Sequence, residues 1–231
     1  MGAAGMSEHL FDHADTRDEA LAKHIADALQ RDISARGAAS IAVSGGRSPR
    51  GLFLKLAARP LDWSRVHITL VDERWVDTAS ADSNERLVRE TLLQGPAADA
   101  NFIGLKTAHA DPREAIPALV AALATMPLPL TCVVLGMGDD GHTASWFPQA
   151  SNLGALLDPD NPAPVAVCDP VTAPHLRMTL TLPVVLAASE IMLYITGDAK
   201  REVLARAAAA DYPVAAITAQ QHNPASIWWA P

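Results

Sequence analysis

The residues best placed for chemistry in this sequence are a histidine and two aspartates within one glycine-rich turn. Residues 136–148 read Gly-Met-Gly-Asp-Asp-Gly-His-Thr-Ala-Ser-Trp-Phe-Pro, which places Asp140 two positions before His142. An imidazole can take a proton from water at neutral pH and return it to a leaving alkoxide, and a carboxylate beside it can orient the ring. The pair favours hydrolysis with water as the nucleophile, although a single turn histidine is more often simply exposed to solvent.

The apolar run before this turn indicates a buried parallel strand. Residues 131–135 are mostly apolar or β-branched and lie between a proline and a glycine. Ligands of open α/β sheets bind beyond the carboxyl ends of the strands, where loops expose backbone and side chains to a crevice. We therefore expect His142 at such a crevice.

Strand and helix patterns alternate along most of the chain. Buried strands are predicted at residues 40–43, 66–71, 131–135 and 190–196, with closing strands at 214–217 and 226–229. Thr16 and Glu19 form a capping box for the first helix, and Ser48 is expected to cap the second. The alternation predicts an α/β fold with one domain over residues 1–231, built on a mainly parallel open sheet with helices on both faces.

Residues 147–182 depart from this alternation. The prolines between Phe147 and Pro164 forbid one long helix, so we expect a loop with a short helix. Strands are predicted at 165–168 and 178–182, and the alternating pattern of the second is typical of a half-exposed or antiparallel strand. A small subdomain is therefore expected around residues 147–182.

Polar segments follow four of the predicted strands, after residues 43, 71, 135 and 196, and right-handed crossovers bring such ends to one edge of a sheet. The loop 44–49, Ser-Gly-Gly-Arg-Ser-Pro, offers free amides and a helix N-terminus that can bind phosphate, although a plain strand-to-helix turn explains it equally well. Arg74, Arg177 and Lys200 lie near other strand ends. Together they could supply the positive charge that an anionic ligand needs.

Composition limits the classes of partner. With 231 residues, 49% of them hydrophobic, and a formal net charge of -8, the chain can bury a full core and lacks the basic character of a nucleic-acid binder. Its apolar runs are too short to cross a bilayer. Cys132 and Cys168 lie in apolar runs typical of buried reduced thiols, and the scattered histidines predict no required metal. We expect a cytoplasmic protein, either a monomer or a small homo-oligomer.

Residues 136–141 also satisfy the Gly-x-Gly-x-x-Gly spacing of dinucleotide-binding loops. That motif requires an uninterrupted helix after its third glycine and an acidic residue about 20 positions further on. Pro148 interrupts the helix early, and Asp169 comes too late in the chain. A nicotinamide cofactor is therefore not expected.

Taken together, these motifs give the chain a resemblance to the 6-phosphogluconolactonases of the bacterial type, which are related in fold to glucosamine-6-phosphate deaminase and ribose-5-phosphate isomerase. The segments that carry the resemblance are 44–49, 71–76, 83–84, 135–148, 177–181 and 197–200. The resemblance implies hydrolysis of 6-phospho-D-glucono-1,5-lactone to 6-phosphogluconate in the oxidative pentose phosphate pathway, without a cofactor.

The resemblance also implies roles for single residues. His142 would be the general base that activates water, Asp140 would orient it, and Arg74 would hold the substrate near its reacting end or its phosphate. The further candidates for binding the substrate or its phosphate are Ser44, Gly45, Gly46, Arg47, Asp72, Glu73, Gly138, Arg177 and Lys200.

Two alternative functions are open at this point. An amino-sugar-phosphate deaminase or isomerase would share the glycine loop and the Asp-Gly-His turn, but the deaminase pattern carries a glutamate five residues after the histidine, where this chain has Phe147. A sensor that binds sugar phosphates without catalysis would share the phosphate site. A sensor would have no catalytic use for the pair of Asp140 and His142.

Overall fold

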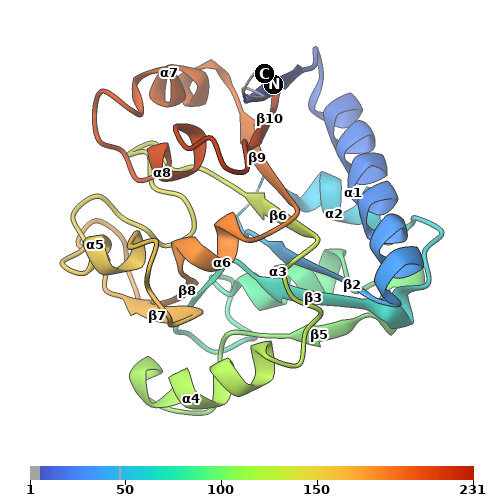
Figure 1. Cartoon of the computed structure of the whole chain (residues 1–231), viewed down its shortest axis with the longest axis horizontal. Helices are drawn as coiled ribbons and strands as arrows, with labels where there is room; N and C mark the ends of the chain where they lie inside the picture. The colour runs from blue at the N-terminus through green and yellow to red at the C-terminus, as the bar shows by residue number, and fades with distance from the viewer. Residues whose placement is uncertain (1–5, 47) are drawn as a thin grey trace.

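The computed structural model describes residues 6–46 and 48–231, and a seven-stranded parallel sheet forms their centre (Figure 1). The strand order is β1-β10-β9-β6-β2-β3-β5, and every pair is parallel. The strands are β1 (Ser7–Leu10), β2 (Ala39–Val43), β3 (Val66–Leu70), β5 (Asn101–Ile103), β6 (Cys132–Leu135), β9 (Glu190–Thr196) and β10 (Ser226–Ala230). The predicted fold class is confirmed.

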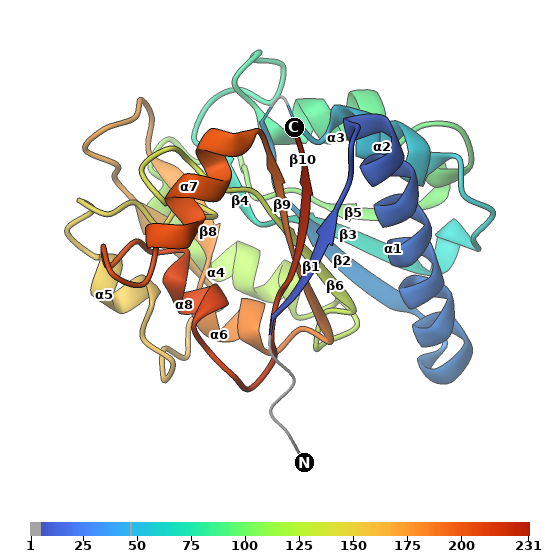
Figure 2. The ribbon, with the colours of Figure 1, turned by 90° about the horizontal axis from the view of Figure 1, so that it is seen from above.

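Helices cover both faces of this sheet, as the view from above shows (Figure 2). One face carries α1 (Ala14–Arg36), α2 (Arg50–Ala57) and α3 (Asn84–Thr91). The other carries α4 (Pro112–Leu123), α5 (Leu153–Leu156), α6 (Leu182–Leu186), α7 (Asp198–Arg206) and α8 (Ala215–Thr218). In the described residues, no helix is long and apolar enough to cross a membrane.

The long helix α1 shows how the sequence pattern becomes packing. Leu21, Ile25, Leu29 and Ile33 recur at helical spacing and are all buried against the sheet. Burying each of these side chains stabilises the fold by about 1.5 to 3 kcal/mol. The helix ends at Gly37, which adopts the left-handed conformation with φ 84° and donates its N–H to the Ile33 carbonyl.

Two predicted helix caps are wrong. The helix α1 begins at Ala14 after His13, and the Thr16 hydroxyl donates to the His13 carbonyl (2.8 Å) within the first turn. This local bond uses the hydroxyl that a capping box would need. The helix α2 begins at Arg50 after Pro49, so Ser48 lies in the preceding turn. There the Ser48 carbonyl accepts a hydrogen bond from the distant Tyr194 hydroxyl (2.9 Å).

Residues 214–217, predicted as a closing strand, instead lead into the helix α8. The Val214 N–H donates to the Gly141 carbonyl (3.0 Å), and Ile217 is fully buried. Alanine favours helix over strand, and Ala215 and Ala216 supply the first turn. The edge position is taken by β1, which has few apolar residues and was not predicted from the sequence.

A second sheet forms where the small subdomain was predicted. It is antiparallel, with the order β4-β8-β7, and comprises β4 (Asp72–Arg74), β8 (Arg177–Leu180) and β7 (Val165–Cys168). All of β8 is buried, so the antiparallel interpretation of its pattern is correct and the half-exposed one is wrong. Since β4 follows β3 directly, this sheet also takes in residues 72–74, which lie outside the predicted boundaries.

Candidate active site

The carboxyl ends of the central strands open into one cavity of about 390 Å³. Its walls come from the segments after β2, β3, β6 and β9, the four strand ends that the sequence pattern singled out. The predicted site residues that line it are Ser44, Gly45, Gly46, Asp72, Arg74, Gly138, His142, Arg177 and Lys200. The predicted phosphate-binding residue Arg47 lies outside the described residues.

The turn after β6 holds Asp140 and His142 in direct contact. The His142 Nδ1 lies 2.5 Å from Asp140 Oδ1, and the same carboxylate oxygen accepts the His142 backbone N–H (3.2 Å). Because Nδ1 is occupied by the carboxylate, Nε2 is the ring nitrogen left to accept a proton. The Phe147 ring stacks on the imidazole with 4.2 Å between centroids, which restricts its rotation.

The environment of Asp140 keeps its carboxylate ionised. Burial acts to raise the pKa of Asp140, but the hydrogen bond and the charge of His142 outweigh it, so the pKa lies below its ordinary value. An ionised carboxylate on Nδ1 fixes the ring tautomer and stabilises the imidazolium that forms when Nε2 takes a proton. Asp140 can therefore act as an orienting group at neutral pH.

Two glycines of this turn, Gly138 and Gly141, are required by its geometry. A Cβ on Gly138 would lie 2.2 Å from the His142 ring and 2.6 Å from Asp140 Oδ1. Gly141 has φ 76°, and a Cβ there would lie 2.4 Å from the Tyr212 ring. The Gly138 N–H donates to the His142 carbonyl (2.8 Å), which closes the turn.

The glycine loop after β2 packs tightly against this turn and against α3. The Ser44 hydroxyl accepts the Gly136 N–H (3.1 Å), which connects the two loops. A Cβ on Gly45 would lie 1.8 Å from Asn84 Oδ1, and Gly46 has φ 92°, so both positions need glycine. The N–H groups of Gly45 and Gly46 donate to no other group in the described part of the chain, which leaves them for a ligand.

Among the residues that the structure describes, three cations lie on the cavity wall. Arg177 is only 6% exposed, and its Nε has no hydrogen-bond partner within the residues that the structure describes. A buried cation on the wall of a cavity favours an anionic ligand, which would offset the cost of burying its charge. Arg74 donates to Asn84 Oδ1 (2.9 Å) and to the Asp82 carbonyl (2.8 Å). Lys200 pairs with Asp139 at 2.6 Å and stands in the first turn of α7.

The strand β4 separates its acidic residues onto opposite sides. Successive strand residues face opposite ways, so Asp72 and Arg74 line the cavity while Glu73 does not. Glu73 is fully buried and accepts the backbone N–H groups of Asn84 (2.8 Å), Glu85 (2.7 Å) and Arg74 (2.7 Å). It holds the N-terminus of α3, which corrects its predicted place among the substrate-binding residues.

Comparison with known proteins agrees with this geometry. Residues 12–229 match the protein family described as glucosamine-6-phosphate isomerases/6-phosphogluconolactonase. This chain belongs to that family. A 6-phosphogluconolactonase of Rhizobium meliloti (strain 1021) is 42% identical over 228 residues, covering 96% of this chain and 98% of that protein. A 6-phosphogluconolactonase of Pseudomonas aeruginosa is 40% identical over 232 residues, covering 99% and 96%.

A solved structure of the same family has nearly the same fold. The crystal structure of a 6-phosphogluconolactonase from Shewanella baltica OS155 is 39% identical and matches with a TM-score of 0.95 over 99% of both chains. The resemblance drawn from the sequence motifs is thereby confirmed.

The cysteines and the arrangement of possible metal ligands indicate which kinds of catalysis the described residues can support. Cys132 and Cys168 are free and buried, as predicted, and burial raises the pKa of the Cys168 thiol to about 11. That thiol is protonated at neutral pH and is therefore a poor nucleophile. In residues 6–46 and 48–231, no three His, Cys, Asp or Glu side chains come together as a metal site.

The polar residues of the cavity wall that were not predicted as site residues include Ser48, which was expected as a helix cap, Asn84, and Tyr194 and Thr196 in β9. The last two lie in a strand that reads as uniformly buried. Thr196 is the final residue of β9, and its position at the carboxyl end of a central strand is the signal that could have found it.

Proposed function

We propose that this chain hydrolyses 6-phospho-D-glucono-1,5-lactone to 6-phosphogluconate, a step of the oxidative pentose phosphate pathway. The observation that carries the proposal is the contact of His142 Nδ1 with Asp140 Oδ1 at the edge of a cavity whose described lining includes Arg74, Arg177 and Lys200. The similarity to 6-phosphogluconolactonases over almost the whole chain supports it.

In the proposed reaction, His142 acts as a general base at Nε2. It takes a proton from a water molecule while the water oxygen attacks the lactone carbonyl carbon. The bond between that carbon and the ring oxygen then breaks, and the imidazolium returns the proton to the departing ring oxygen. The new carboxylic acid loses its proton to solvent, and Asp140 stabilises the imidazolium between the two transfers.

The phosphate of the substrate is proposed to bind in the same cavity. Its acceptor oxygens fit the free N–H groups of Gly45 and Gly46 and the guanidinium of Arg177. Lys200, which pairs with Asp139, supplies a second charge in the same cavity. Each charge-assisted contact contributes about 1.5 to 3 kcal/mol, enough to hold an anion on an acidic protein. Arg74 is proposed to hold the reacting end of the sugar.

The deaminase alternative loses support at Phe147. That side chain is buried and stacks on the His142 ring, so the position where the deaminase pattern carries a carboxylate is apolar here. Without a carboxylate at position 147, assisted ring opening of an amino sugar lacks the acid that the deaminase pattern places there. Hydrolysis of a lactone needs only water at a carbonyl carbon.

The proposed function is tested by following hydrolysis of the phosphorylated lactone above its spontaneous rate. We expect acceleration with 6-phospho-D-glucono-1,5-lactone, a much higher KM with non-phosphorylated gluconolactone, and no release of ammonia from glucosamine 6-phosphate. Binding of 6-phosphogluconate without any acceleration would favour the sensor. Equal efficiency with both lactones would contradict the phosphate site.

A further inference from the structure

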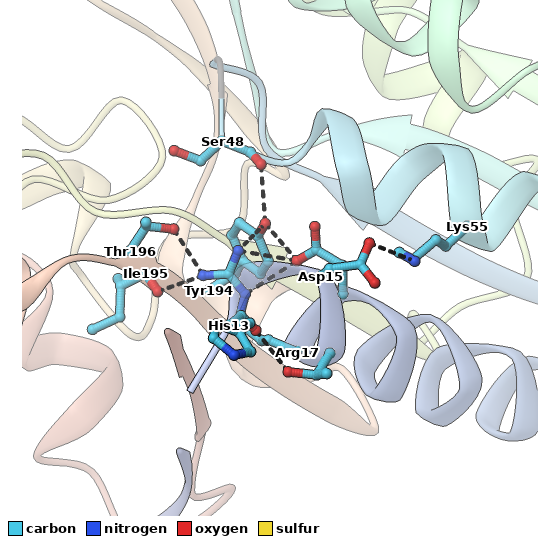
Figure 3. A network of polar contacts seen from close by, with 10 residues as sticks. His13, Asp15, Arg17, Ser48, Lys55, Tyr194, Ile195 and Thr196 are labelled. Atoms are coloured by element: carbon cyan, nitrogen blue, oxygen red, sulfur yellow. Dashed lines mark hydrogen bonds and ion pairs between the residues drawn. The ribbon is translucent and has the colours of Figure 1, made fainter. Parts of the chain in front are cut away.

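A fully buried arginine lies directly behind the cavity. Arg17 stands in the first turn of α1 and is 1% exposed, and the proposed reaction does not use it. Figure 3 shows its guanidinium close to Tyr194, Ile195 and Thr196, at the end of β9. Burying a cation is costly, so its partners must compensate for the lost water.

Every N–H of this guanidinium has an acceptor. The Nε and Nη2 atoms donate to Asp18 Oδ1 at 3.1 and 3.0 Å, and Nη2 also donates to the Tyr194 hydroxyl. The Nη1 atom donates to the Ile195 carbonyl (2.8 Å) and to the Thr196 hydroxyl oxygen (2.7 Å). Because the guanidinium is planar and all five of its N–H donors are engaged, its position and orientation are fixed.

The network also holds the far end of the glycine loop. The Tyr194 hydroxyl accepts from Arg17 and shares its single hydrogen between Asp18 Oδ1 (2.8 Å) and the Ser48 carbonyl (2.9 Å). Ser48, Tyr194 and Thr196 all line the cavity. Arg17 therefore fixes two walls of the cavity without touching its contents.

The bond from Arg17 decides what the Thr196 hydroxyl can do. Arginine has no acceptor, so the Thr196 oxygen must accept and its own hydrogen must point elsewhere. The hydroxyl makes no further hydrogen bond within the described part of the chain, and Thr196 lines the cavity that Lys200 also lines. Accepting from a cation also polarises the O–H and makes it a stronger donor.

We propose that Arg17 is a positioning residue that presents the Thr196 hydroxyl as a hydrogen-bond donor to the phosphate of the substrate. Phosphate oxygens are acceptors only, so a hydroxyl locked as a donor favours them over the neutral hydroxyl of a non-phosphorylated sugar. The inference rests on the proposed function and adds Thr196 to the residues that select a phosphorylated lactone.

The test is steady-state kinetics of Thr196→Val with both lactones. Valine keeps the shape of threonine and removes the donor, so KM for the phosphorylated lactone should rise about tenfold or more with kcat nearly unchanged. KM for the non-phosphorylated lactone should not change. Thr196→Ser should restore the wild-type KM. Thr218→Val is the matched control, because its hydroxyl bonds to the Val214 carbonyl outside the cavity and both KM values should stay constant.

Valine leaves one Arg17 donor without its acceptor, so Thr196→Ala, which admits a water molecule, is a second variant with the same expected rise in KM. An unchanged KM in the folded variants, or an equal rise for both lactones, would overturn the inference.

Arg17→Lys should raise KM for the phosphorylated lactone in the wild-type background and add little to the effect of Thr196→Val. Additive effects would show that Arg17 does not act through Thr196. If the wild-type protein hydrolyses neither lactone, the proposed function fails first.

Discussion

The substitution Gly138→Ala tests whether the position of His142 matters more than its presence. Gly138 closes the turn that carries the Asp140 and His142 pair, and its φ is not positive, so alanine can adopt its backbone conformation. The added Cβ would lie 2.2 Å from the His142 ring and 2.6 Å from Asp140 Oδ1. Ordinary contacts of this kind begin near 3.4 Å, so the ring has to move by about 1 Å.

A shift of that size in a reacting group costs about a hundredfold in rate. We therefore expect kcat for the phosphorylated lactone to fall about a hundredfold in Gly138→Ala. The atoms nearest to the added Cβ belong to His142 and Asp140 and not to the residues proposed to bind the phosphate. The affinity for 6-phosphogluconate, measured by calorimetry, should therefore change little. Lactone hydrolysis at saturating substrate, corrected for the spontaneous rate, gives the measurement.

The matched control is Gly154→Ala. Gly154 lies in α5, has no positive φ, and a Cβ there meets nothing within 4 Å. The substitution Gly154→Ala should therefore leave kcat unchanged. If Gly138→Ala keeps the wild-type kcat while folding normally, the contact between Asp140 and His142 does not control the reaction, and the reasoning from the geometry of this turn is refuted.

Three further predictions follow from the same structure. Arg177→Ala and Lys200→Ala should each raise KM for the phosphorylated lactone about tenfold or more through loss of a charge-assisted contact, with no change for the non-phosphorylated lactone. Glu73→Gln should lower the free energy of unfolding in urea by about 1 to 3 kcal/mol, since an amide cannot accept all of the bonds at the start of α3; an effect on KM alone would restore its substrate-binding role. Burial lowers the pKa of His9 and of His67, so folding favours their neutral forms. The stability they contribute is present above pH about 6.5 and is lost as the pH falls below it, and the thermal midpoint should decline less steeply with acid in His67→Gln; an identical slope would contradict the assignment.

The central strands could be predicted because the pattern that specifies each of them lies within a short stretch of sequence. Residues 131–135 and 190–196 are apolar runs long enough to be buried on both faces, and a parallel strand needs that pattern. The edge strand β1 has no such requirement, since one side of it is open, and its polar sequence gives no signal. Residues 214–217 were predicted as a strand from their apolar residues, but Ala215 and Ala216 favour helix, and Val214 bonds to the Gly141 carbonyl rather than to a neighbouring strand.

In the site too, contacts between residues close in sequence could be predicted, and contacts that depend on the fold could not. Asp140 and His142 lie two residues apart, so their contact depends only on one turn and could be predicted. The place of Glu73 depends on β4 being a strand, because only the alternation of that strand turns it away from the cavity. Arg17 and Thr196 are separated by most of the chain, and only the folded structure brings them together.

The central claim is that His142 activates water for attack on the lactone. Its most direct test is the rate of hydrolysis of 6-phospho-D-glucono-1,5-lactone by His142→Asn at saturating substrate, with His222→Asn at an exposed position as control. We predict that His142→Asn loses the acceleration over the spontaneous rate, still binds 6-phosphogluconate, and that His222→Asn behaves as wild type. Undiminished hydrolysis by His142→Asn would contradict the claim.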